Sequence, residues 1–123
     1  MINRGREIEL LEIKSISPKV FALIDSERSA AGNALGASRE GFAAVCAKVR
    51  IACHVLERRA IENYLWDSAV KKVKGDRYRA LAPYEKISEV SPAWSKAENW
   101  RIAREMNKQD LENTDLGAFL ESV

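Results

Sequence analysis

Acidic side chains follow two apolar segments of this 123-residue chain, at the points where each segment gives way to polar residues. Asp25 and Glu27 come directly after the apolar run 20–24, and Glu62 follows a second one at 50–56. Hard divalent cations need oxygen ligands from several directions, and carboxylates at the ends of neighbouring strands supply them. The pattern therefore predicts a divalent-metal site that handles phosphoryl groups or cuts phosphodiesters.

The spacing of the acids fits a cation but also has a simpler interpretation. Asp25 and Glu27 are two residues apart, so both face the same side if the segment is extended. Like charges at that spacing repel unless a cation lies between them or one carboxyl takes up a proton. Two solvated loop acids are the alternative. Glu62 falls on the first turn of an expected helix, where any carboxylate interacts favourably with the helix N-terminus.

Basic residues lie near these acids in the sequence. Arg58 and Arg59 could hold phosphate oxygens in a fork, or could pair with neighbouring glutamates. A second basic stretch, which includes Tyr78, contains Lys71, Lys72, Lys74, Arg77 and Arg79. Such a stretch suits a nucleic-acid backbone and is equally typical of a solvated face, so both interpretations stay open.

Other chemistries have less support. His54 is the single histidine and falls inside an expected strand, which argues against a Ser–His or Cys–His pair. Cys46 and Cys53 lie in apolar segments, so we expect them to be small buried thiols. A zinc site built from both cysteines and His54 is the alternative, but it would lack the paired short spacing of zinc motifs. The sequence contains neither a Gly-x-x-x-x-Gly-Lys-Ser/Thr loop nor a Gly-x-Gly-x-x-Gly fingerprint, so we expect no ATP site of either kind.

Composition indicates one domain with a modest core. Hydrophobic residues make up 46% and charged residues 31% of the chain, which is typical of soluble globular proteins. Because the formal net charge is only +2, affinity for nucleic acid must come from local patches. No apolar stretch approaches the ~20 residues that span a bilayer, and no signal-peptide core is present, so we expect a cytoplasmic protein with no membrane partner.

The elements that must position these residues form an α/β pattern. The expected order is a helix over 6–16, a strand over 19–25, a small-residue loop over 29–37, a helix over 39–49 capped by Ser38, and a strand over 50–56. This order predicts one βαβ unit with parallel strands and a right-handed crossover. Ligands of open parallel sheets bind beyond the carboxyl ends of the strands, which is where Asp25 falls.

The second half of the chain is expected to be helical. A helix over 60–73, broken at Asp67, is predicted to end at Gly75. Two further helices are expected at 95–107 and, with Thr114 as cap, at 115–122. The predicted inward residues of all these helices are Phe42, Val45, Cys46, Val49, Ile61, Tyr64, Leu65, Ala69, Val70, Val73, Ile102, Ala103, Met106, Leu116, Phe119 and Leu120.

Two segments, Val20–Arg28 and His54–Leu65, together resemble the TOPRIM fold. More narrowly, they are similar to the TOPRIM half of the overcoming-lysogenization-defect (OLD) family of nucleases. The family's Asp-x-Asp at a strand end matches Asp25-Ser26-Glu27, and its downstream acid in an Arg-x-Ile-Glu-Asn-Tyr setting matches Arg59–Tyr64. A basic residue in the family's helical part matches Lys96.

The resemblance implies a single domain over 1–123 with a small parallel-sheet, TOPRIM-like (Rossmann-like) βαβ core and a helical C-terminal half. It implies hydrolysis of DNA phosphodiester bonds, with Mg²⁺ or Mn²⁺ held by Asp25, Glu27 and Glu62. Lys96 would be a further catalytic residue that stabilises charge on the phosphate oxygens. The residues implied to bind nucleic acid are Arg59, Lys71, Lys72 and Lys74. An ABC-type ATPase is the implied partner, and phage defence is the implied setting.

The resemblance covers about residues 18–123 and departs from the family pattern in two places. Glu27 is one methylene longer than the family's aspartate, and Mg²⁺ tolerates distorted geometry poorly. No strand–glutamate–glycine element precedes Val20, so we expect the C-terminal part of a larger nuclease or a truncated relative. The alternative function is a non-catalytic interaction module that docks on an ATPase partner or forms a homo-oligomer. A receiver-type phosphotransfer domain has less support, because Val55-Leu56-Glu57 ends the second strand without an aspartate.

Overall fold

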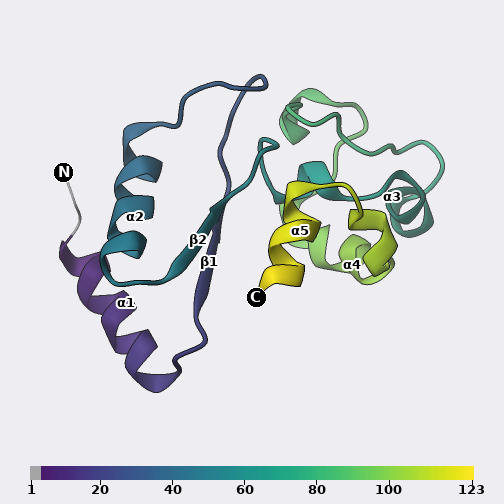
Figure 1. Ribbon diagram of the computed structural model, residues 1–123. Coiled ribbons are helices and arrows are strands. Elements are labelled where there is room, and N and C mark those ends of the chain that lie inside the picture. The colour runs from purple at the N-terminus through teal and green to yellow at the C-terminus, as the bar shows by residue number, and fades with distance from the viewer. Residues whose placement is uncertain (1–3) are drawn as a thin grey trace.

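The computed structural model describes residues 4–123, so residues 1–3 of the predicted domain lie outside the described part. An N-terminal α/β half joins a C-terminal helical half (Figure 1). The main elements are α1 (Arg4–Ile16), β1 (Phe21–Ile24), α2 (Ala37–Lys48), β2 (Ala52–Val55), α3 (Asp67–Lys74), α4 (Asn99–Arg104) and α5 (Asp115–Ser122). Short 3-10 helices are η1 (Ile61–Tyr64), η2 (Ile87–Glu89), η3 (Lys96–Glu98) and η4 (Lys108–Leu111). Within the described range, no helix has both the length and the apolar character needed to cross a membrane.

The two strands pair in parallel, which confirms the predicted strand–helix–strand unit. Phe21 pairs with Ala52 and Ile24 with Val55, so both strands end at the same level. Ala22 and Cys53 pack into the cluster shared with α1 and α2. The carboxyl ends of the strands therefore meet at one edge of the sheet, where the predicted acids lie.

The opposite face of the sheet is covered by α5, the last helix in the sequence. His54 lies one residue beyond Cys53 in β2, so its side chain faces the other side of the sheet. The Phe119 ring of α5 stacks on the His54 imidazole, with centroids 4.8 Å apart, and meets the Phe21 ring edge-on at 5.4 Å. His54 is thus a packed strand histidine, as predicted.

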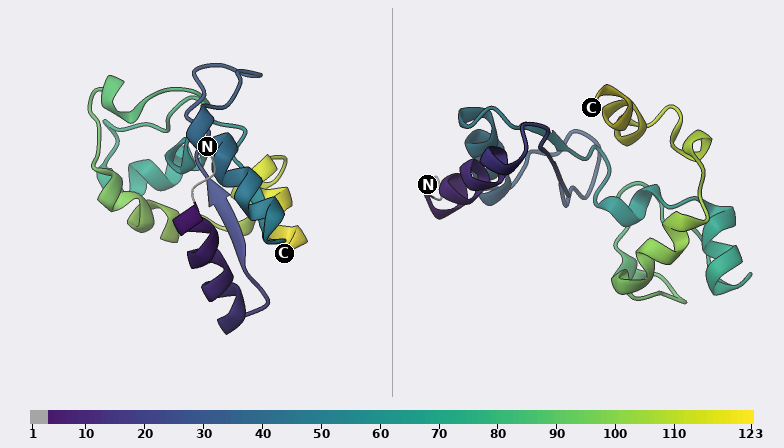
Figure 2. Two further views of the ribbon diagram at one scale, coloured as in Figure 1. Left: turned by 90° about the vertical axis from the view of Figure 1, so that its left-hand side faces the viewer. Right: turned by 90° about the horizontal axis from the view of Figure 1, so that it is seen from below.

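Three apolar clusters hold the elements together. The first, between α1, α2 and the strands, contains Cys46, Val49 and Ile51. The second joins Leu56, at the end of β2, to Tyr64 and Leu116. The third fills the helical half with Leu65, Ala69, Val70, Leu81, Val90, Trp94 and Ile102. Because the second cluster connects the strand ends to the helical half, it fixes the two halves relative to each other. The right-hand view of Figure 2 shows these halves side by side.

Two of the predicted helices are divided. The helix expected over 60–73 becomes η1 and α3, because the backbones of Leu65 and Trp66 between them are extended. The break lets Leu65 enter the third cluster. The helix expected over 95–107 begins as η3, continues directly into α4 and ends at Arg104.

Some predicted inward residues lie at the surface instead. Ile61 is 38% exposed, Leu120 is 42% exposed, and Ala103 is exposed as well. In η1, successive residues turn by about 120° rather than about 100°, which moves Ile61 away from the face that a regular helix would bury.

The predicted helix caps are confirmed at two of three positions. Thr114 accepts the Gly117 amide at the start of α5, and Gly75 ends α3 with a φ of +115°. Ser38 does not cap α2, because the helix begins earlier, with Gly36 at the N-cap and no capping side chain.

Candidate functional site

The two principal acids of the predicted site come together from the ends of both strands. Asp25 follows β1 directly, and Glu62 lies in η1, which follows β2. Asp25 Oδ1 accepts a hydrogen bond from the Ile61 amide at 3.1 Å, which ties the end of β1 to the residue before Glu62. The convergence expected from parallel strands is therefore present.

Glu62 is buried, at 5% exposure, and pairs with a lysine. Its Oε2 lies 3.3 Å from Nζ of Lys96, whose side chain is 63% exposed. A buried carboxylate that loses its partner is strongly destabilising, so the lysine compensates Glu62 in this structure. Lys96, placed in the site by the resemblance alone, thus lies beside the acids.

The surroundings of Asp25 disfavour its ionised form. Burial raises the pKa of Asp25, and the nearby Glu62 carboxylate raises it further. The Ile61 amide, Lys96 and Arg39 lower the pKa of Asp25, but the net pKa remains above the ordinary value. Perturbed carboxyl groups of this kind are enriched at functional sites.

Glu27 does not face this pair. Its φ of +57° lies in the left-handed region, so the expectation of an extended Asp25–Glu27 segment is wrong. The Glu27 carboxylate is 55% exposed and lies 3.2 Å from the Arg39 guanidinium. Across residues 4–123, no three Asp, Glu, His or Cys side chains group closely enough to hold a metal ion. The metal role of Glu27 stays a prediction that requires its ion pair with Arg39 to open.

Arg39 is a site residue that the sequence did not indicate. Its Nε donates to the Asp25 carbonyl oxygen at 2.6 Å while the same guanidinium pairs with Glu27. A signal was available in the topology, because the crossover helix α2 begins at the carboxyl edge of β1 and its first turn must lie near that edge.

The arginines predicted to hold phosphate instead hold the loops after the strands. Arg59 donates to the carbonyl oxygens of Glu27 at 3.0 Å and Arg28 at 3.3 Å. Arg58 donates to the Asn63 carbonyl oxygen at 2.9 Å and lies over the Tyr64 ring. Both guanidinium groups therefore fix backbone around the site in this structure, and the phosphate-binding role of Arg59 stays a prediction.

Asn63 anchors η1 to the irregular chain that follows α3. It is 1% exposed. Its Nδ2 donates to the carbonyl oxygens of Ala82 and Glu85, both at 2.8 Å, and its Oδ1 accepts the Ala60 amide at 3.1 Å. These bonds hold the segment that carries Glu62.

Tyr64 and Asp115 anchor η1 to α5. The Tyr64 hydroxyl donates to Asp115 Oδ1 at 2.6 Å, and Asp115 Oδ2 accepts the Glu57 amide at 2.9 Å and bonds His54 Nε2 at 2.7 Å. Burial opposes ionisation of Asp115, but these hydrogen bonds outweigh it and hold its pKa below the ordinary value. Burial, together with the bond to Asp115, raises the pKa of Tyr64. The predicted packing role of Tyr64 is confirmed.

The α3 lysines predicted to contact nucleic acid all have partners. Lys71 donates to the Tyr78 carbonyl oxygen at 2.6 Å and approaches Asp67. Lys72 pairs with Glu105 at 2.8 Å, and Lys74 with Glu98 at 2.9 Å. Surface ion pairs contribute little to stability, so a phosphate could replace these acids. The predicted role in DNA binding therefore stays a prediction.

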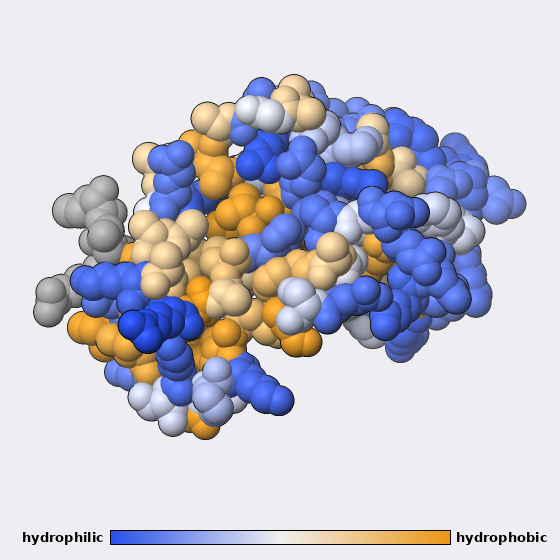
Figure 3. All heavy atoms as spheres, viewed as in Figure 1, coloured by the Kyte–Doolittle hydropathy of each residue, from blue (hydrophilic) through white to orange (hydrophobic). Residues whose placement is uncertain are grey.

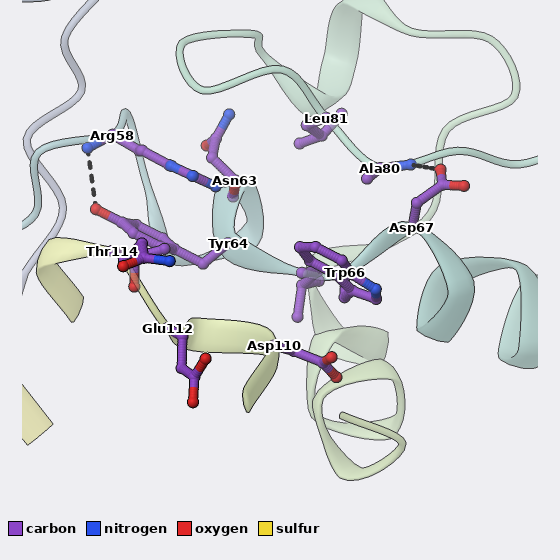
Figure 4. Close-up of a pocket in the computed structure, with 12 residues that line it drawn as sticks. Arg58, Asn63, Tyr64, Trp66, Asp67, Ala80, Leu81, Asp110, Glu112 and Thr114 are labelled. Atoms are coloured by element: carbon purple, nitrogen blue, oxygen red, sulfur yellow. Dashed lines mark hydrogen bonds between the residues drawn. The ribbon is translucent and has the colours of Figure 1, made fainter. Parts of the chain in front are cut away.

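A pocket of about 360 Å³ lies on another side of η1, against the start of α3 and the chain between η4 and α5 (Figure 4). Its lining includes Tyr64, Trp66 and Asp110, and excludes Asp25, Glu62 and Lys96. The acidic pair is thus separate from this hollow.

The cysteines are free thiols, Cys46 buried and Cys53 half-buried. Burial, with a further contribution from Cys46, raises the pKa of the Cys53 thiol to about 11. An un-ionised thiol is a poor metal ligand or nucleophile, in keeping with the packing role predicted for both.

No protein-family model, curated protein or solved structure matches this chain.

Proposed function

We propose that the chain is the catalytic part of a divalent-metal-dependent DNA nuclease of the TOPRIM type. One observation carries the proposal: Asp25, Glu62 and Lys96 meet beyond the carboxyl ends of two parallel strands. Burial and the neighbouring Glu62 carboxylate oppose the ionisation of Asp25, and a cation bound between the two carboxyl groups would relieve this opposition. The ABC-type ATPase partner belongs to the same proposal.

The donor set fits Mg²⁺ or Mn²⁺, which prefer carboxylate oxygens. Asp25 and Glu62 would hold the ion, and it would supply Lewis acidity toward a phosphate oxygen. Lys96 presents three N–H donors at the exposed side of the pair, where it stabilises negative charge developing on the phosphate. Arg39 holds the Asp25 backbone and so orients the carboxylate that follows β1.

The test is a Mn²⁺ titration followed by thermal unfolding of the wild type, Asp25→Asn, Glu62→Gln and a control, Glu9→Gln, which changes an exposed acid of α1. An ion that binds only the folded state stabilises it, by about 2.7 kcal/mol at a hundredfold excess over Kd. We expect this shift in the wild type and the control, and its loss in the two site variants. Equal shifts in all four proteins would refute the proposal.

Without metal, Asp25→Asn should be more stable than the wild type. A folded-state pKa above the unfolded value means that the folded protein binds more protons between the two pKa values. Stability therefore falls as the pH rises through that window, and the loss is complete once the pH exceeds the folded-state pKa. Asparagine has no such loss and keeps an oxygen for the Ile61 amide, so metal-free Asp25→Asn should unfold at a higher temperature than wild type. A lower Tm at pH 7 would contradict this account of the site.

A second candidate is the non-catalytic interaction module, favoured by apolar residues exposed on the N-terminal half (Figure 3). On α1 and at the start of β1, the exposed fractions are 50% for Ile8, 46% for Leu11, 47% for Ile13, 87% for Ile16 and 45% for Phe21. Exposed apolar patches of this kind are typical of association surfaces. This candidate predicts no Mn²⁺ response, together with self-association in sedimentation velocity that Ile16→Ser weakens. A monomeric protein with a Mn²⁺ shift would exclude it.

A further inference from the structure

An exposed tryptophan on α4 has two arginines close to its ring. The Trp100 side chain is 58% exposed. The guanidinium carbons of Arg101 and Arg104 lie 5.4 Å and 5.2 Å from its ring centroid. Ile102, on the same short helix, is fully buried in the third cluster, so α4 is anchored to the core and presents Trp100 outward.

Neither arginine pairs with an acid in the part of the chain that the structure describes. The acids that flank α4, Glu98 and Glu105, already pair with Lys74 and Lys72. Arg101 and Arg104 influence them only at longer range, and within residues 4–123 neither guanidinium has a carboxylate at ion-pair distance. Their positive charge is therefore available to an external anion, unlike that of the α3 lysines.

The position of this face relates it to the acidic pair. Lys96, the partner of Glu62, begins the helical run η3–α4, and Trp100 follows one turn later. Arg104 is four residues beyond Trp100, so the two lie on the same side of α4. At a rise of about 1.5–2.0 Å per residue, the run from Lys96 to Arg104 extends over roughly 12–14 Å, which is longer than one nucleotide.

A lone exposed aromatic residue needs no explanation. An exposed indole close to two guanidinium groups that pair with no carboxylate of residues 4–123 matches one kind of ligand. Single-stranded nucleic acids present flat bases that stack on aromatic rings and phosphates that pair with arginine. A duplex offers its phosphates but keeps its bases stacked inside, so it could use the arginines and not the indole.

We propose that the face formed by Trp100, Arg101 and Arg104 binds single-stranded DNA, with a base stacked on Trp100 and phosphates at the two arginines. The strand then continues toward Lys96 and the acidic pair. This assignment of the strand as substrate rests on the proposed nuclease function, whereas the binding itself needs no metal.

The experiment measures fluorescence anisotropy of a labelled single-stranded oligothymidine, with the full chain in EDTA. The variants are Trp100→Ala, Trp100→Phe and a matched control, Trp66→Ala. The control removes another tryptophan, 51% exposed, over whose ring no arginine of residues 4–123 lies. Base–aromatic stacking predicts that Trp100→Ala weakens binding on the order of 10-fold to 100-fold. Trp100→Phe should retain most of the affinity, and Trp66→Ala should match wild type.

The arginines are tested by salt dependence. Each phosphate contact on a single strand contributes about −0.7 to the slope of log K against log salt. The double variant Arg101→Gln/Arg104→Gln should therefore make that slope shallower by about 1.4 units, while Trp100→Ala leaves it unchanged. Loss of affinity with an unchanged Tm supports the assignment.

Three results would overturn it: no binding to the oligothymidine, equal losses in Trp66→Ala and Trp100→Ala, or a duplex that binds as tightly as the single strand and is insensitive to Trp100→Ala. The Mn²⁺ response of the wild type tests the proposed function, and oligothymidine binding in EDTA tests this inference. A wild type that responds to Mn²⁺ but does not bind the oligothymidine would overturn this inference alone, and one that binds it without a Mn²⁺ response would overturn the proposed function alone.

Discussion

The buried side chain of Asn63 should be among the most sensitive positions of the molecule. It makes three hydrogen bonds to backbone groups, at 2.8, 2.8 and 3.1 Å, and is 1% exposed. A hydrogen bond contributes about 1 kcal/mol net, and a buried group left without a partner costs about 1–3 kcal/mol. Replacement by alanine removes all three bonds and leaves a small cavity, so Asn63→Ala should lower the free energy of unfolding by about 3–5 kcal/mol.

The aspartate variant tests the direction of these bonds. Asn63→Asp keeps the shape but places an oxygen against the carbonyl oxygens of Ala82 and Glu85, where the amide group donates now. At neutral pH it should be at least as damaging as alanine. Protonation restores one donor, so part of the loss should be recovered as the pH falls toward 4, where aspartic acid titrates at about 3.9 when unperturbed.

The assay is urea unfolding followed by circular dichroism, with Asn33→Ala, in the exposed loop before α2, as the control. The midpoint should shift without a change in m, because the surface exposed on unfolding is the same. A loss below about 1 kcal/mol for Asn63→Ala, or one equal to that of Asn33→Ala, would refute the view that Asn63 anchors η1.

Two further predictions concern α5. The pKa of Asp115 is held below its ordinary value, so its contribution to stability is complete above the unfolded pKa, about 3.9, and is lost as the pH falls through the folded pKa. The urea midpoint of wild type should therefore fall more steeply below about pH 4 than that of Asp115→Asn, and identical pH profiles would contradict this. A Cβ on Gly117 would collide with the Leu111 carbonyl group, so Gly117→Ala should cost about 1–3 kcal/mol. Gly36→Ala is the control, because its added Cβ meets no described atom within 4 Å, and equal urea midpoints of the two variants would count against the collision.

Local patterns were sufficient to predict the sheet and the meeting of Asp25 with Glu62. Alternating strand and helix periodicity predicts the βαβ unit, and parallel pairing then brings the residues after each strand to one edge. The left-handed backbone of Glu27 could not be predicted this way, because glutamate rarely adopts a positive φ and no glycine marks the turn. The orientation of Glu27 toward Arg39 follows from that one backbone angle.

The remaining site contacts could not be predicted because they join residues far apart in the sequence. Asn63 bonds residues of the irregular chain near 82–85, and Asp115 bonds His54, Tyr64 and the Glu57 amide from the far end of the chain. The helix or strand propensity of a residue does not predict partners that are distant in the sequence. Asparagine and aspartate are mostly exposed in proteins. The residue types therefore gave no reason to expect that Asn63 is buried or that Asp115 makes three hydrogen bonds.

One departure from the predicted secondary structure coincides with the candidate site. In place of the first turn of a regular helix, the chain forms the 3-10 helix η1, in which successive side chains point about 120° apart. Glu62 can thereby meet Lys96 while Asn63 bonds the irregular chain and Tyr64 bonds Asp115. A regular helix continuing into α3 would keep Leu65 from the third cluster, and the extended residues that break it let η1 turn separately from α3. Local sequence preference and structure often disagree where function constrains the backbone. The disagreement at 60–66 is therefore in keeping with the proposed site at η1.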